Sequence, residues 1–200
     1  MNKHDLSHIK LPLFGKSNLY LGPEYQLKHA ICGKRVKSVI NVGNVAYTNA
    51  FKFTKREDAG EQEIKGIKFL FCPVEDEVDE NLRQYFPKIN QFIREAISRG
   101  ENVFIHSQKG ISRAAAALSA FVIEEGKHSA EVATNLVRAD RSCIAPNIGF
   151  HLQLSVFERS LKPKPTVQSE EATLFSNRGA DCSDRGDSIF KDSKEIMPSL

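Results

Sequence analysis

The sequence predicts an α/β fold with a central, mainly parallel sheet and helices on both faces. Short apolar, strand-like runs follow one another along the chain, and helical patterns fill most of the gaps between them. Alternation of this kind is typical of a sheet with helical cover. The 200 residues, 40% of them hydrophobic and 26% charged, leave room for one globular domain of roughly 150 residues and a tail.

Four segments carry the strand signal, at 18–21, 36–42, 67–71 and 102–105. Each is a short apolar run of the kind that buried strands show. The stretch 44–66 is rich in charge instead. We expect it to be a long exposed connection with some helix.

The stretch 79–100 shows helical periodicity, because its apolar residues recur at intervals of three and four. Pro87 interrupts the pattern, since proline removes an N–H and disfavours helix in the residue before it. We therefore expect a short turn beginning at Asp79, a plausible N-cap, and then a main helix that begins near Pro87, or a kink there. Gly100 is expected just past the end of this helix.

The segment 112–125 is apolar on nearly every side and is predicted to be a buried central helix that stops at Gly126. Ser129 is predicted to cap a further helix that runs to about Ala139. Pro146 and Asn147 then mark a loop.

A last helix is predicted at 149–161. Its large apolar side chains are expected to complete the core. These residues are Phe150, Leu152, Leu154, Val156 and Phe157.

No apolar stretch of the sequence is long enough to span a membrane. Residues 1–6 lack a charged segment followed by a sustained apolar one, so we expect no signal peptide and a cytoplasmic or nuclear location. The net charge of +3 is mild, and no basic block is dense enough to predict binding to nucleic acid or to an anionic membrane.

Four cysteines lie far apart without the pairing of metal ligands, at Cys32, Cys72, Cys143 and Cys182. This spacing favours free thiols in a reducing compartment over disulfides or a zinc site. We expect neither a metal nor another cofactor.

The segment 103–113 combines a strand-like run, a short loop and the start of an Ala-rich helix. Six backbone N–H groups, from Gln108 to Arg113, could point into such a loop, and the helix presents its positive end there. Arg113 adds a guanidinium that can bind an oxyanion through two hydrogen bonds. The predicted phosphate-binding residues are Ser107, Gln108, Lys109, Gly110, Ile111, Ser112 and Arg113.

The order His106, Ser107, five residues and Arg113 resembles the signature of the cysteine-dependent protein tyrosine and dual-specificity phosphatases, with Ser107 where that family has its cysteine. The resemblance to the small dual-specificity phosphatases covers about residues 19–161 and implies their fold. The chain is most similar to the phosphoserine/threonine/tyrosine-interacting pseudophosphatase group. That group keeps Gly-Ile-Ser-Arg and also lacks the cysteine.

The missing sulfur matters because a thiol in such a loop can have its pKa lowered from roughly 8.5 to about 3.5–7.5, which yields a thiolate nucleophile at neutral pH. A serine hydroxyl needs a general base instead, and loops of this type stabilise anions rather than accept protons. In the resembled family the histidine lies below the loop as a structural and electrostatic element. Rescue by a pair of Ser107 and His106 is therefore not expected.

The resemblance also implies roles for residues that flank the loop. Asp76 matches the general acid, although Glu75, Glu77 or a merely solvated acidic loop are alternatives. Ser112 matches the hydroxyl that assists breakdown of the cysteinyl-phosphate. Asn147 matches an asparagine that braces the loop, or it caps the last helix. Arg113 is expected to be an oxyanion ligand rather than only an ion-pair partner.

Three functions are consistent with these residues. The favoured hypothesis is a catalytically impaired pseudophosphatase that binds phosphorylated Ser, Thr or Tyr residues of partner proteins in signalling. The alternative is an active dual-specificity phosphatase for the same residues whose nucleophilic cysteine is replaced here by Ser107. In a third hypothesis only the fold is used, and the pocket is vestigial.

The predicted organisation is an N-terminal extension at 1–16, the phosphatase-like domain at 17–161, and a disordered tail at 162–200. Phosphorylated proteins, protein kinases among them, are the expected partners. We expect a monomer.

Overall fold

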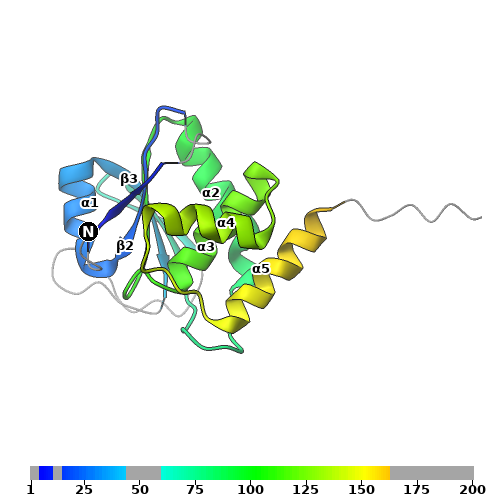
Figure 1. Ribbon diagram of the computed structural model, residues 1–200. Helices are drawn as coiled ribbons and strands as arrows, with labels where there is room; N and C mark the ends of the chain where they lie inside the picture. The colour runs from blue at the N-terminus through cyan, green and yellow to red at the C-terminus, as the bar shows by residue number, and fades with distance from the viewer. Residues whose placement is uncertain (1–4, 11–14, 44–59, 163–200) are drawn as a thin grey trace, which may run out of the picture. The chain divides into compact units, whose positions relative to one another are not determined.

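The computed structural model describes residues 5–10, 15–43 and 60–162 (Figure 1). In this part of the chain six strands form one sheet in the order β1-β2-β6-β3-β5-β4. The four central strands are parallel, and β1 and β4 are antiparallel edges. The predicted α/β class with a mainly parallel sheet is therefore confirmed. The strands are β1 (Ser7–Ile9), β2 (Leu19–Pro23), β3 (Val36–Val42), β4 (Gly60–Ile64), β5 (Ile67–Cys72) and β6 (Asn102–Ser107).

The four central strands are those that the sequence predicts, whereas the two edge strands are additional. β1 lies within the segment assigned to an N-terminal extension and pairs with β2. β4 corrects the expectation that all of 44–66 is a connection; residues 44–59, where the expected helix is not tested, lie outside the described residues. It is a strand because Lys65 and Gly66, both with positive φ, close a tight hairpin that pairs β4 with β5.

The helices are α1 (Leu27–Lys34), α2 (Phe86–Ser98), α3 (Arg113–Gly126), α4 (Ala130–Asp140) and α5 (Ile148–Leu161), with 3-10 turns η2 (Glu24–Gln26) and η3 (Arg83–Tyr85). As predicted, a turn precedes α2, Pro87 lies in its first turn, and Gly100 follows its end with φ +69°. The N-cap of α2 is Tyr85 and not Asp79. Ser129 caps α4 by accepting a hydrogen bond from the N–H of Val132.

One helix ends differently from the prediction. Gly126 is still helical, and the left-handed residue that ends α3 is Lys127, with φ 52°. A Cβ at Gly126 would lie 2.3 Å from the ring of His128, so this glycine makes space for a side chain rather than supplying the turn.

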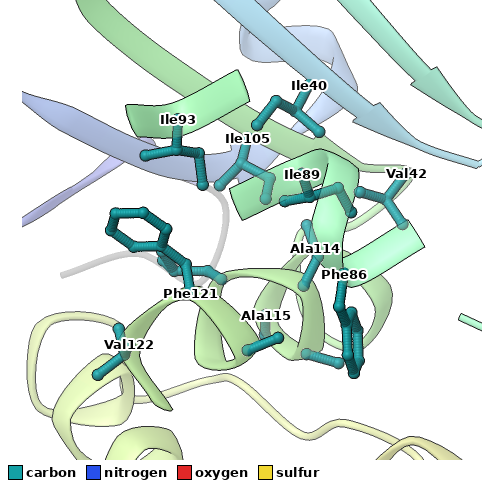
Figure 2. Packing of buried hydrophobic residues seen from close by; sticks show 14 of the residues in the cluster. Ile40, Val42, Phe86, Ile89, Ile93, Ile105, Ala114, Ala115, Phe121 and Val122 are labelled. Atoms are coloured by element: carbon teal, nitrogen blue, oxygen red, sulfur yellow. The ribbon is translucent and has the colours of Figure 1, made fainter. Parts of the chain in front are cut away.

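Alternate residues along the central strands feed two hydrophobic clusters, one on each face of the sheet. The larger cluster packs β-strand residues such as Ile40 and Ile105 against α2, α3, α4 and α5, and Figure 2 shows its centre around Phe121 and Phe86. The smaller cluster packs Val39 and Phe104 beneath α1. Helices therefore cover both faces, as predicted, and α3 is the buried central helix.

The last helix contributes only part of its apolar surface to the core. Phe150, Leu154 and Phe157 are buried, whereas Leu152 is 62% exposed and Val156 is 42% exposed. The expectation that all five residues complete the core is wrong for these two, because α5 lies at the surface and can bury only one stripe.

The chain divides into two compact units, Met1–Pro163 and Lys164–Leu200, and all described residues belong to the first. The predicted tail at 162–200 lies, apart from Lys162, outside the described residues. No helix in the described part has the length and apolar character needed to cross a membrane.

Candidate functional site

The predicted site residues meet at the carboxyl ends of the parallel strands, where ligands bind in open α/β sheets. Ser107 is the last residue of β6 and pairs with Pro23 of β2. The cavity above it has a volume of about 450 Å³. It is lined by Asp76, Ser107, Gln108, Lys109, Ile111, Ser112, Arg113, Ala145 and Asn147.

The segment 107–113, here called the phosphate loop, joins β6 to α3. The N–H of Gly110 donates a hydrogen bond to Ser107 Oγ at 3.2 Å, so this amide points towards the inside of the loop. Gly110 has φ +62°, and a Cβ there would lie 2.3 Å from the carbonyl carbon and oxygen of Gly22. The turn and the close approach to β2 both require glycine at this position.

Arg113 is the first residue of α3 and is 6% exposed. Its Nη1 donates to the carbonyl oxygen of Val74 at 2.9 Å, and it lies 3.9 Å from a carboxylate oxygen of Glu75. Its Nε makes no hydrogen bond; Asp76 Oδ2 lies 3.7 Å away. A buried guanidinium N–H of this kind is costly to leave unpaired, and an oxyanion in the cavity would satisfy it.

A second segment, residues 74–80, follows β5 and is here called the acid loop. Asp76 Oδ1 accepts hydrogen bonds from Ser112 Oγ at 2.6 Å and from Asn147 Nδ2 at 3.0 Å. The N–H of Asn147 donates in turn to Ser112 Oγ at 3.1 Å. These bonds bring the Asp76 carboxyl group to the phosphate loop.

The neighbouring acids of the acid loop are placed less favourably for acid chemistry. Glu75 has a 59% exposed side chain, and Glu77 contributes its backbone carbonyl, which accepts from Asn147 Nδ2 at 3.2 Å. Of the three carboxylates left open by the sequence, only Asp76 lines the cavity.

Asn147 has the capping role, one of the two that the sequence left open, and its side chain also bonds the acid loop. Its Oδ1 accepts from the N–H of Phe150 at 3.0 Å, which caps α5. Its Nδ2 donates to Asp76 and to the Glu77 carbonyl, which ties the acid loop to that helix. One side chain therefore couples the end of α5 to the acid loop.

His106 lies beneath the phosphate loop and not in the cavity. Complete burial lowers the pKa of its imidazole to about 3, so the ring is neutral at pH 7. It stacks on Phe104 at a centroid distance of 5.1 Å, and adjacent strand residues point to opposite faces of the sheet. Ser107 faces the cavity, so His106 is not placed to act as its general base.

Cys72, the last residue of β5, is not placed to supply the missing thiolate. It does not line the cavity, and burial raises the pKa of its thiol to about 12, with Lys88 acting weakly in the opposite direction. Cys32, Cys72 and Cys143 form no disulfide in the described part of the chain.

The phosphate loop, the preceding strand and the acid loop have the layout of a known family. Residues 19–160 match the family model described as "Dual specificity phosphatase, catalytic domain". The chain belongs to this dual specificity phosphatase family. The match agrees closely with the span of resemblance expected from the sequence.

Individual proteins of this dual specificity phosphatase family share about a third of their residues with the chain over the matched part. The chain is 35% identical over 102 residues to dual specificity protein phosphatase 22 of Homo sapiens, which covers 51% of this chain and 55% of that protein. The chain thus spans about half the length of this curated relative.

Two solved structures resemble the phosphatase domain in fold. The human tyrosine phosphatase-like serine/threonine/tyrosine-interacting protein is 26% identical with a TM-score of 0.60, covering 78% of this chain and 96% of its own. A mouse protein of dual specificity phosphatase type, crystallised with zinc tungstate, is 22% identical with a TM-score of 0.62, covering 78% and 87%.

Some contributors to this phosphatase-type site were not anticipated. A Cβ at Gly43, just after β3, would lie 2.9 Å from Arg113 Nη1, so the missing side chain leaves room for the guanidinium. Burial raises the pKa of the Glu24 carboxyl above its ordinary value, although the charge of the nearby Arg113 acts in the opposite direction. Arg141 donates hydrogen bonds to the phosphate loop from outside. Gly43 and Glu24 each follow a parallel strand, and this position in the sequence could have indicated that they lie near the site. No feature of the sequence could have indicated Arg141.

Proposed function

We propose that this chain is a pseudophosphatase, which binds phosphorylated Ser, Thr or Tyr residues of partner proteins without hydrolysing them. The observation that carries the proposal is Arg113, which is buried at the cavity and has an Nε without a hydrogen-bond partner. It shares the phosphate loop with Ser107, which stands where the family signature has cysteine. The cradle retains its cation and its inward-facing amide, while Ser107 has no histidine beside it in the cavity lining that the described residues form.

The electrostatics of the site support retention of a phosphate group. An incoming dianion meets a helix N-terminus and a guanidinium, both of which favour negative charge. A thiolate at position 107 would repel the dianion, and a neutral hydroxyl does not. The bound phosphoryl group also meets no activated nucleophile, so the complex persists.

Replacement of Arg113 by Met tests this proposal. Hydrogen bonds to charged groups contribute about 1.5–3 kcal/mol each, so we expect the affinity for a phosphopeptide to fall by at least tenfold in isothermal titration calorimetry. Arg138→Met is the matched control, because Arg138 bonds Asn135 on α4 and not the cavity. Equal affinity of the Arg113→Met protein and the unaltered chain would refute the proposal.

A second candidate function is favoured by the intact acid network. Asp76, Ser112 and Asn147 remain hydrogen-bonded as in a site prepared for proton transfer, which supports a phosphatase whose nucleophilic cysteine is replaced here by Ser107. Hydrolysis of p-nitrophenyl phosphate by the chain and by its Ser107→Cys variant tests whether a thiol at position 107 completes the site.

We expect turnover only in the Ser107→Cys variant, with most of it lost when Asp76→Ala is added. Turnover by the unaltered chain would favour the enzyme and count against the pseudophosphatase. Phosphorylated proteins, protein kinases among them, are the proposed partners, in the cytoplasm or the nucleus, and the proposed state is a monomer.

A further inference from the structure

One short segment after α4, from Arg141 to Ala145, bonds the backbone of the phosphate loop. Arg141 is 3% exposed, and its Nε donates to the carbonyl oxygen of Gly110 at 3.0 Å. Its Nη2 donates to the carbonyl oxygen of Lys109 at 3.3 Å. The N–H of Ala145 donates to the carbonyl oxygen of Ile111 at 2.9 Å. Three consecutive carbonyl groups of the phosphate loop are therefore bonded by this segment, two of them by Arg141, which does not line the cavity.

The geometry of the peptide unit converts these outward bonds into inward-facing donors. In a planar trans peptide the C=O of one residue and the N–H of the next point in opposite directions. The C=O of Lys109 accepts from Arg141, and the N–H of the same peptide, on Gly110, donates to Ser107 Oγ. The Gly110 carbonyl bond directs the N–H of Ile111 towards the cavity by the same rule.

The guanidinium adds charge as well as orientation. A positive group that donates to a peptide carbonyl polarises the peptide, which strengthens the N–H at its other end. Because Arg141 is buried, this effect is little screened by solvent.

The same guanidinium reaches the N-terminal edge strand. Arg141 Nη1 donates to the carbonyl oxygen of Asp5 and to Ser7 Oγ, at 2.5 Å and 3.2 Å. The N–H of Lys10 donates to the adjacent Asp140 at 2.7 Å. Nη1 of Arg141 is therefore held by β1, while its Nε and Nη2 hold the phosphate loop.

We propose that Arg141 is a positioning residue of the oxyanion site, which orients the Gly110 and Ile111 amides and ties the phosphate loop to β1. The proposal rests on the oxyanion binding proposed above, although its geometric part stands without a ligand. Arg141 does not line the cavity, so it acts through the loop amides and not on the ligand.

Amide hydrogen exchange and tungstate binding test the proposal on the full chain. Exchange at Gly110 and Ile111 is measured by NMR without ligand, and sodium tungstate is then titrated by calorimetry. We expect Arg141→Met to speed exchange at both amides and to weaken tungstate binding by tenfold or more. Arg141→Lys should give an intermediate loss, because one ammonium cannot hold two carbonyls in a fixed fork. Arg138→Met is the control.

The outcomes separate this proposal from the proposed function. Unaltered exchange and affinity in both Arg141 variants would overturn the positioning role. If the unaltered chain binds no tungstate, the proposed function fails, and exchange at the two amides alone decides the positioning role. Should Arg141→Met not fold, Arg141→Lys and Ser7→Ala decide: faster exchange at Gly110 in these two supports the role, and unchanged exchange in both refutes it.

Discussion

The phosphate loop and the acid loop line one cavity, but they are held by different kinds of contact. The phosphate loop is fixed through its backbone, with carbonyls bonded by Arg141 and Ala145 and an amide bonded to Ser107. The acid loop is fixed largely through side chains. From α5, Asn147 bonds Asp76 and Gln153 Nε2 donates to the Glu80 carbonyl at 2.7 Å. Ser112 and Arg113 of the phosphate loop bond the acid loop as well. The bonds from α5 can therefore be removed without removing a backbone contact of the phosphate loop.

The largest expected effect concerns His106, which is buried beneath the phosphate loop. The pKa of His106 is about 3 in the folded chain, against an ordinary value of about 6.5 when unfolded. Below pH 6.5 the unfolded chain therefore binds the extra proton, and stability is lost as the pH falls towards 3. We expect this histidine to lower the free energy of unfolding by about 2 kcal/mol between pH 6 and pH 4.5.

Urea unfolding at the two pH values measures this loss, and His106→Gln provides the reference for the carboxyl groups that titrate in the same range. The variant should show a smaller pH dependence than the unaltered chain. Identical pH dependence in both proteins would mean that the imidazole is hydrated in the folded state.

A smaller effect is expected at the cation of the phosphate loop. In Gly43→Ala the new methyl group would lie 2.9 Å from Arg113 Nη1, and the backbone of Gly43 is not left-handed, so the guanidinium is displaced without backbone strain. We expect tungstate affinity to fall about tenfold, equivalent to about 1.4 kcal/mol, with little change in unfolding free energy. Calorimetry and urea unfolding measure the two quantities.

Gly33→Ala is the matched control, because its Cβ would meet only the His29 ring of α1, at 3.0 Å. If both alanine variants bind tungstate like the unaltered chain, Arg113 is not the dominant ligand.

The smallest effect concerns the acid loop and separates the two roles of Asn147. Asn147→Ala removes the cap of α5 and the two Nδ2 bonds to the acid loop, whereas Asn147→Ser can keep the cap and loses only the two Nδ2 bonds. We expect Asn147→Ala to be about 1 kcal/mol less stable than Asn147→Ser in urea unfolding. In the Ser107→Cys background both should lower aryl phosphate turnover.

Tungstate affinity should be unchanged by either Asn147 substitution, because the phosphate loop keeps its own backbone contacts. A loss of affinity equal to that in Gly43→Ala would mean that the bonds from α5 also set the geometry of the phosphate loop.

The same contrast explains what the sequence could predict. The phosphate loop is contiguous, so the run from Ser107 to Arg113, its strand and its helix are visible as one pattern. The contact between Asp76 and Asn147 joins residues 71 positions apart, and periodicity cannot show it. The resemblance to a family implied a role for each residue, but their contact is known only from the structure.

Other features depended on tertiary context that local patterns do not contain. β1 has three residues, and β4 is mostly exposed, so neither has the apolar run of a buried strand. Leu152 and Val156 are apolar but lie on the outer side of α5. Arg141 resembles any surface arginine in the sequence, and only the fold buries it against the phosphate loop.

The strand pairing of Ser107 has an evolutionary consequence. Its backbone position is set by the pairing with Pro23, and the preceding His106 pairs with Gly22 and Asn41, so the strand pairing does not depend on the side chain at 107. Its Oγ accepts one hydrogen bond, from the N–H of Gly110, and sulfur is a weaker acceptor than oxygen. Exchange of oxygen for sulfur therefore changes one hydrogen bond of the loop and leaves the sheet pairing as it is. Under the proposed function, one substitution separates a phosphate-binding protein from a catalyst, and the sheet is the same on both sides of that change.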